Sequence, residues 1–285
     1  MKRIAIYILS LLLLSPFKGW SAEKLEQSGY STVNGIRMYY EIRGQGEPLV
    51  LIHGGGSTIE TTFGRVIGRL AKDHKVIAMD LQAHGRTGDR NAPESFEQDA
   101  DDVAQLLKNL HIDKADFFGF SNGATTAVQI AIRHPEMVTK LVLGSPLCKR
   151  NGVPPQFWDF MKHASLANMP VELKEAYLKD SPNEKGLQNM HDKDAERMLN
   201  FKDIPDGQIK AIKVPTFIII GDKDVITPEH AIELHRDINN SELAIIPGVH
   251  GEYIEEITTL KFGSKEAAFV IPMIKFFLKV RQISN

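Results

Sequence analysis

The chain has 285 residues, of which 42% are hydrophobic and 25% charged, and its formal net charge is −2. A length of this order predicts one large domain whose core needs no disulfides for stability. The near-neutral charge argues against nucleic acid or an anionic membrane as a partner and favours a small-molecule substrate. The single cysteine, Cys148, cannot form an intramolecular disulfide, and we expect it to be buried at the end of a strand.

The N-terminus has the pattern of an export signal. Two basic residues precede the apolar run Ile4–Leu14, and small residues follow it up to Ala22. The run is too short to cross about 30 Å of hydrocarbon as a helix, which argues against stable membrane insertion after cleavage. We therefore expect residues 1–22 to be a signal peptide, residues 23–285 to form the mature domain, and the protein to be periplasmic or secreted. An uncleaved anchor is the alternative.

Strands and helices alternate along the rest of the chain. Apolar runs such as Pro48–His53 are typical of strands buried on both faces, and amphipathic periodicity indicates the helices. Thr227 and Pro228 are typical of a helix start. Together these patterns predict an α/β fold with a mainly parallel sheet flanked by helices, whose sites lie at the carboxyl ends of the strands. The predicted strands cover 38–42, 48–53, 75–80, 115–120, 137–143, 215–221 and 242–247, and the helices 57–72, 95–110, 122–134, 227–238 and 265–280.

Residues 149–213 interrupt this alternation. The segment lacks buried-strand runs and reads as several short helices broken at Pro170, Pro182 and Pro205. Because it follows the strand over 137–143, we expect it to be a small helical cap over the carboxyl ends of the strands. Its aromatic and methionine side chains either line an apolar pocket or hold the cap to the body.

The strongest motif is Gly119–Gly123, which reads G-x-S-x-G between an apolar strand and a helix that begins with small residues. A serine at such a sharp strand-to-helix turn adopts a strained backbone and exposes its hydroxyl. The flanking glycines are needed because side chains there would clash. This context predicts that Ser121 is a nucleophile; a purely structural turn is the alternative.

A second motif, His53–Gly56, follows another apolar strand and contains three consecutive glycines. Such a loop can present a backbone amide to the oxyanion of an acyl-transfer reaction. We expect the amides of Gly55 and Asn122 to form the oxyanion hole, with Gly54 as the alternative to Gly55. His53 is expected to hold the loop and not to carry protons.

A serine hydroxyl needs a base to be nucleophilic at neutral pH. Of the ten histidines, His250 follows the last apolar strand and so lies at the same edge of the sheet as Ser121. His134 reads as a helix cap, and His84 lies in a glycine-bearing loop that could line the site. The remaining histidines fall in helical or cap segments, where solvent exposure or packing explains them: His111, His163, His191, His230 and His235.

The base needs a carboxylate that fixes its tautomer. Asp222 and Asp224 both follow the strand over 215–221. Asp224 lies further into the loop and can reach His250, whereas Asp222 can bond to the backbone of its own turn. We expect Asp224 to be the acid and keep Asp222 as the alternative.

From about Tyr30 to its C-terminus the sequence resembles the α/β-hydrolase superfamily. The resemblance is carried by the segments LIHGGG, DLQAHGRT, GFSNG, PTFIIIGDKD and PGVHG, in that order. It implies the triad Ser121, Asp224 and His250, the oxyanion donors Gly55 and Asn122, and a cap after the sixth strand. One departure is visible: where relatives usually have D-x-x-G-x-G-x-S, Ala83 replaces the first glycine and Thr87 the serine. This difference affects the expected substrate and not the expected chemistry.

These residues predict a serine hydrolase that cleaves a small carboxylic ester through an acyl-serine. The same triad also serves lactonases, hydrolases of carbon–carbon bonds and perhydrolases, and the fold also serves as a non-catalytic binding module. Haloalkane dehalogenases and epoxide hydrolases are disfavoured because their nucleophile at this position is an aspartate. We expect no metal or organic cofactor, because the sequence has neither a clustered His/Cys ligand pattern nor a phosphate-binding loop.

Overall fold

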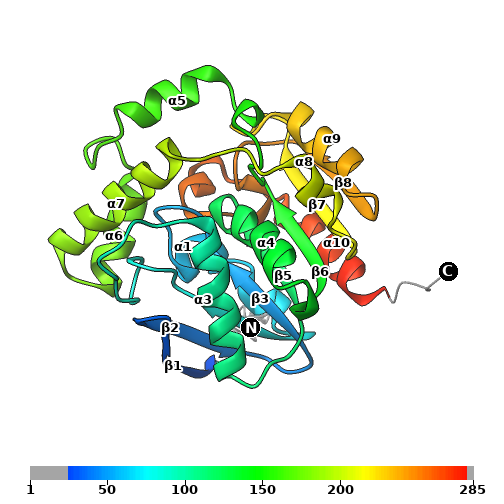
Figure 1. Cartoon of the computed structure of the whole chain (residues 1–285), viewed down its shortest axis with the longest axis horizontal. Coiled ribbons are helices and arrows are strands. Elements are labelled where there is room, and N and C mark those ends of the chain that lie inside the picture. Colours follow the sequence, from blue (N-terminus) through cyan, green and yellow to red (C-terminus); the bar gives the residue numbers. More distant parts are fainter. Residues whose placement is uncertain (1–24, 281–285) are drawn as a thin grey trace, which may run out of the picture.

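An eight-stranded sheet forms the centre of the protein (Figure 1). The computed structural model describes residues 25–280, so the predicted signal peptide lies outside the described residues. In the sheet order β1-β2-β4-β3-β5-β6-β7-β8, the pairs β1–β2 and β2–β4 are antiparallel and all the others are parallel. The strands are β1 (Leu25–Val33), β2 (Ile36–Arg43), β3 (Glu47–Ile52), β4 (His74–Met79), β5 (Ala115–Phe120), β6 (Val138–Gly144), β7 (Thr216–Gly221) and β8 (Ser241–Ile246).

Helices cover both faces of the sheet, because side chains alternate between the faces along each strand. Val50 and Ile52 of β3 pack with α3, α4 and α9, whereas Leu49 and Leu51 pack with α1, α2 and α10. The mainly parallel, two-sided architecture predicted from the sequence is therefore confirmed. The helices are α1 (Ile59–Phe63), α2 (Ile67–Leu70), α3 (Phe96–Asn109), α4 (Asn122–Arg133), α5 (Pro155–Lys162), α6 (Val171–Asp180), α7 (Glu184–Leu199), α8 (Asp206–Lys210), α9 (Pro228–Asp237) and α10 (Ala267–Lys279), with 3-10 turns η1 (Pro135–Met137), η2 (Arg150–Gly152), η3 (Glu252–Ile254) and η4 (Ile257–Phe262).

Two predictions about local structure were incomplete. The single helix expected over 57–72 is two short helices, since α1 ends at Gly64, whose N–H donates to the Glu60 carbonyl oxygen at 3.0 Å. Glycine has low helix propensity, which favours a break there. Strand β1 was not predicted, because its residues are mostly exposed and form no apolar run. The other predicted elements are present with small shifts at their ends, and Thr227 caps α9.

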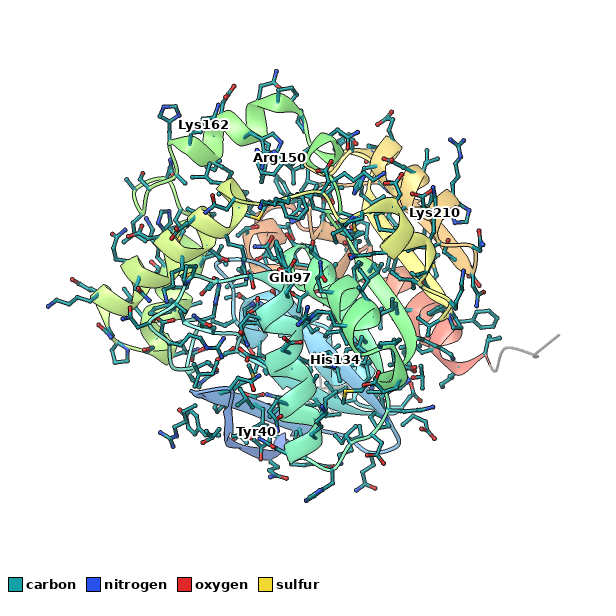
Figure 2. The ribbon with its side chains drawn as sticks, viewed as in Figure 1. Tyr40, Glu97, His134, Arg150, Lys162 and Lys210 are labelled. Carbon is teal, nitrogen blue, oxygen red and sulfur yellow. The ribbon has the colours of Figure 1, made fainter. Side chains whose placement is uncertain are left out.

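The helical insertion follows the sixth strand, as expected. In Figure 1, α5, α6 and α7 form an arc beyond the carboxyl ends of the strands, and α8 contacts α4 and α9. Pro170 caps α6, Pro205 caps α8, and Pro182 lies in the turn between α6 and α7. Figure 2 shows Lys162 on α5 at the outer edge of the insertion, far from Tyr40 on β2.

The segment after β8, which the sequence left unassigned, forms the 3-10 turns η3 and η4. Its residues Tyr253 and Ile254 are fully buried, and η3 contacts α10. The segment therefore brings Tyr253 into the core next to the loops that follow β6 and β7. Over residues 25–280, every helix is too short or too polar to cross a membrane.

Candidate active site

Ser121 occupies the turn between β5 and α4. Its backbone has φ 54° and ψ −121°, outside the regions that a serine ordinarily adopts, at a cost of about 1–3 kcal/mol. A Cβ atom at Gly119 would lie closer than 3.0 Å to the carbonyl of Gly123, and one at Gly123 closer than 3.0 Å to the carbonyl of Ile52. Both glycines of the motif are therefore required by close backbone packing, which holds the strained serine in place.

His250, on the loop after β8, contacts both partners expected for it. Its Nε2 lies 3.0 Å from Ser121 Oγ, and its Nδ1 lies 2.7 Å from Asp224 Oδ1. Because the carboxylate only accepts, Nδ1 carries the proton and Nε2 accepts from the serine hydroxyl. Burial lowers the pKa of His250, but the charge and hydrogen bond of Asp224, with a contribution from Glu256, raise it above its ordinary value.

Asp224 is held by further donors. The Ser145 hydroxyl donates to its Oδ2 at 2.6 Å, and the Ile226 N–H donates to its Oδ1 at 3.0 Å. Since Ser145 has a single hydroxyl proton, the Tyr253 hydroxyl 2.7 Å away must donate to Ser145. Burial raises the pKa of Asp224, but the positive charge of His250 and these hydrogen bonds bring it below its usual value. The sequence reasoning missed Ser145 and Tyr253.

Asp222 has a different environment. Its Oδ1 accepts the N–H of Gly248 at 2.8 Å, so it ties the loop after β7 to the loop that carries His250. The sequence reasoning considered a bond from Asp222 to the backbone of its own turn, whereas the bond runs to the backbone of the loop after β8. The arrangement brings Asp224, and not Asp222, into contact with His250.

The loop His53–Gly56 lies beside Ser121, and most of its polar groups are engaged. The Gly54 N–H donates to Thr62 Oγ1 at 3.3 Å, and the Gly56 N–H donates to the carboxylate of Asp194. Within residues 25–280, the N–H groups of Gly55 and Asn122 have no hydrogen-bond acceptor. Both residues line the same cavity as Ser121. The donors expected for the oxyanion are thus the ones that remain free.

Comparison with known proteins agrees with this architecture. A family model described as "alpha/beta hydrolase fold" matches residues 47–188. The chain has the alpha/beta hydrolase fold. The sequence is 28% identical to the human serine hydrolase BPHL over 248 residues, which covers 80% of this chain and 82% of that protein. The expected resemblance to the α/β-hydrolase superfamily is confirmed, and these matches support a hydrolase.

Solved structures show the same fold. One is 2-hydroxy-6-oxo-6-phenylhexa-2,4-dienoate hydrolase from Rhodococcus sp. RHA1, with a TM-score of 0.75, 17% identity and coverage of 90% of this chain and all (100%) of that one. Another is the enol-lactonase from Burkholderia xenovorans LB400, with a TM-score of 0.67, 24% identity and coverage of 88% and 100%. At these identities the likeness establishes the fold alone.

Two buried histidines lie near the loop His53–Gly56, which we call the oxyanion loop after the role expected for it, and they differ in their hydrogen bonds. His53 Nδ1 donates to the Gly54 carbonyl at 2.7 Å and its Nε2 accepts the Leu81 N–H at 2.9 Å, so the ring is neutral; burial lowers its pKa to about 3. His84 donates from Nδ1 to the Gln82 carbonyl at 2.7 Å and from Nε2 to Asp194 at 3.0 Å. Burial opposes its charge, but Asp194 raises the pKa of His84 to about 9.

A cavity of about 240 Å³ lies over Ser121. The oxyanion loop and Asn122 form its floor, and α5, α6, α7 and the α5–α6 connection form its walls. The walls are mainly apolar: Phe157, Phe160, Met161, Ala164, Asn168, Met169, Pro170, Leu173, Met190, His191, Asp194, Ala195 and Met198. The insertion therefore supplies most of the surface that a substrate would contact.

Other candidate residues lie away from this cavity. Cys148 is fully buried, which raises the pKa of its thiol to about 12, and its N–H donates to His230. His134 Nε2 lies 2.8 Å from Asp101 Oδ1 at the end of α4. Within residues 25–280, no group of three or more His, Cys, Asp or Glu side chains is arranged to hold a metal ion.

Proposed function

We propose that this protein is a serine hydrolase that cleaves a small carboxylic ester through an acyl-enzyme on Ser121. The observation that carries the proposal is the continuous chain of hydrogen bonds from Ser121 through His250 to Asp224, at 3.0 and 2.7 Å. Serine, base and acid arranged in this order are the machinery of acyl transfer.

In the first half of the proposed reaction, His250 Nε2 takes the proton of Ser121 as Oγ attacks the ester carbonyl. The oxyanion accepts hydrogen bonds from the amides of Gly55 and Asn122, and the amide of Asn122 lies at the N-terminus of α4, where the helix dipole also favours negative charge. His250 then gives its proton to the leaving alcohol. In the second half, His250 activates water, which attacks the acyl-serine and releases the acid.

Asp224 stays ionised throughout this cycle. Its depressed pKa and its three donors keep it negative, so it can stabilise the imidazolium that forms on His250 in both halves. The base is thus positioned by a carboxylate that is itself fixed by Ser145 and by the backbone of Ile226.

The size and lining of the cavity favour a substrate with a small, apolar acyl group. Its volume of about 240 Å³ lies below the range of roughly 300–1,000 Å³ usual for ligand pockets. Its aromatic and methionine lining offers few hydrogen bonds to a polar substrate. We therefore expect short acyl chains or a single aryl ring to be preferred over long acyl chains.

Two alternative substrates are favoured by the relatives. A dienoate hydrolase and an enol-lactonase share this fold. The same serine, base and oxyanion donors would attack the ketone of a carbon–carbon bond substrate or the carbonyl of a lactone. A perhydrolase and a non-catalytic binding module are the remaining alternatives.

The test is turnover of a panel of p-nitrophenyl esters of increasing acyl length, with a lactone, a diketone and an amide added. We expect hydrolysis of the short esters to exceed all other rates, and Ser121→Ala to abolish it. If the wild-type protein turns over the lactone or the diketone but no ester, the ester assignment is wrong. If the wild-type protein hydrolyses none of these compounds, the result favours the non-catalytic binding module.

We also propose that residues 1–22 direct export and are then removed. The support is the order of charged, apolar and small residues around Ile4–Leu14. Mass spectrometry of the protein expressed in bacteria tests this: the expected N-terminus is Ala22 or Glu23, in the periplasm or medium, and an intact Met1 on the mature protein would contradict it.

A further inference from the structure

Asp194 lies on α7, in the helical insertion, yet its carboxylate reaches the oxyanion loop. Its Oδ2 accepts the N–H of Gly56, which is 138 positions away in the sequence, and also lies 3.0 Å from His84 Nε2. The Gly56 N–H also lies 3.3 Å from His84 Nε2, but Asp194 raises the pKa of His84 to about 9, so the ring is charged at neutral pH and both of its nitrogens are donors. The acceptor for the Gly56 N–H is therefore the carboxylate of Asp194.

The carboxylate is itself fixed from the side of the insertion. Arg197, three positions along α7, donates to Asp194 Oδ1 and, at 2.7 Å, to Asp99 Oδ2 on α3. Burial opposes the charge of Asp194, but Arg197 and His84 bring its pKa well below the usual value. Asp194 therefore joins α7 to the oxyanion loop, while Arg197 joins α7 to α3.

The two ends of the oxyanion loop are held by different residues, and the Gly56 end is held by Asp194. His53 and Thr62 hold Gly54, while Gly56 has φ +65° and is held through its N–H by Asp194. Gly55 lies between these two anchors. A Cβ atom at Gly55 would lie closer than 3.0 Å to Asn122 Nδ2 and 3.2 Å from Asp194 Oδ2, so Gly55 packs tightly between the Asn122 side chain and Asp194 of the insertion.

We propose that Asp194 is a positioning residue for the oxyanion hole: by holding Gly56, it fixes the direction of the Gly55 amide, so that docking of α7 onto the body sets the reactivity of Ser121. This inference rests on the proposed function. It assigns the insertion a second role, because α7 both lines the cavity and completes the geometry that stabilises the transition state.

The test compares Asp194→Asn with Asp99→Asn. Both remove one carboxylate from Arg197, but only Asp194 contacts the loop. Both oxygens of Asp194 accept hydrogen bonds, so the single amide oxygen of Asp194→Asn cannot serve Arg197 and the Gly56 N–H at once. With the best p-nitrophenyl ester, we therefore expect this variant to lower kcat by about 10- to 100-fold with KM within about threefold, because a small misplacement of catalytic groups costs rates of that order. The rate of fluorophosphonate labelling of Ser121 should fall by a similar factor. Asp99→Asn should keep kcat within about threefold, whatever it does to the melting temperature.

Two results overturn the inference. One is a kcat for Asp194→Asn within about threefold of wild type. The other is an equal loss of kcat in Asp194→Asn and Asp99→Asn, which would mean that Asp194 only anchors the insertion. If Asp194→Asn does not fold, Asp194→Glu keeps the charge and moves the carboxylate; unchanged kcat in that variant also overturns it. Failure of the proposed function is separate, since it shows in the wild-type protein as the absence of fluorophosphonate labelling at Ser121.

Discussion

The Ser145 hydroxyl lies 2.6 Å from Asp224 Oδ2 and donates its only proton to that carboxylate. The Tyr253 hydroxyl, 2.7 Å from Ser145 Oγ, in turn donates to Ser145. The two hydroxyls therefore form a buried relay of donors that ends on the acid of the candidate triad. Neither hydroxyl touches Ser121 or the cavity, so their effect on reactivity passes through Asp224.

Ser145→Ala should destabilise the protein by about 2 kcal/mol, because it removes the donor to a buried carboxylate oxygen of Asp224 and leaves the Tyr253 hydroxyl only its 3.5 Å contact with the Ile219 carbonyl oxygen. Urea denaturation at pH 7 measures this. The matched control is Thr126→Val, which removes a hydroxyl that is buried and unpartnered within residues 25–280 and should cost little. Equal stabilities for Ser145→Ala and wild type would show that the relay contributes nothing.

Asp224→Asn should lower kcat by about 10⁴-fold, since an amide favours the wrong tautomer of the base and does not stabilise the imidazolium. Asp222→Asn is the control on the same loop: its amide oxygen can still accept the Gly248 N–H, so kcat should stay near wild type. Steady-state kinetics on both variants decide between them. A greater loss in Asp222→Asn than in Asp224→Asn would reverse the assignment of the acid.

Activity should decline at acidic pH. His250 must be neutral to accept the proton of Ser121, and its pKa is raised above 6.5 in the folded protein, chiefly by Asp224 and to a smaller extent by Glu256. The acidic limb of kcat/KM therefore falls as pH drops through a value above 6.5. The variant Glu256→Gln removes a negative charge but keeps the hydrogen bond between His250 and Asp224, so the midpoint of the acidic limb should move to a slightly lower pH. A limb centred below 6.5 in the wild-type enzyme is inconsistent with this environment for His250.

Gly119→Ala should destabilise the protein by at least about 1–3 kcal/mol, because the added Cβ would lie closer than 3.0 Å to backbone atoms of Gly123 and Ala124. Gly207→Ala on α8 is the control, since nothing lies within 4 Å of its Cβ and alanine favours a helix. Thermal unfolding of the two variants compares them. A normal melting temperature for Gly119→Ala would mean that the turn at Ser121 tolerates side chains.

The sequence predicted those parts of the fold and candidate site that depend on local pattern. Ser121, Asp224 and His250 each follow an apolar strand, and parallel strands bring their carboxyl ends to one edge of the sheet, so their proximity could be inferred without coordinates. The insertion could be recognised because residues 149–213 lack strand runs and are broken by prolines.

The supporting residues could not be found in the same way. Tyr253 and Ser145 are 108 positions apart, and Asp194 and Gly56 are 138 apart, so each contact depends on tertiary packing and not on a motif. Asp194 reads as one more charge on an amphipathic helix. A sequence signal existed only for His84, whose glycine-bearing loop suggested a place near the site. Its Nε2 lies 3.3 Å from the Gly56 nitrogen and 3.0 Å from Asp194 Oδ2.

The most direct test of the central claim is covalent labelling of the purified protein with a fluorophosphonate, read by intact mass and peptide mapping. The account predicts one adduct, on Ser121, absent in Ser121→Ala and formed far more slowly in His250→Ala. A folded wild-type protein that stays unlabelled, or carries its adduct on another residue, would contradict the assignment of Ser121 as the nucleophile.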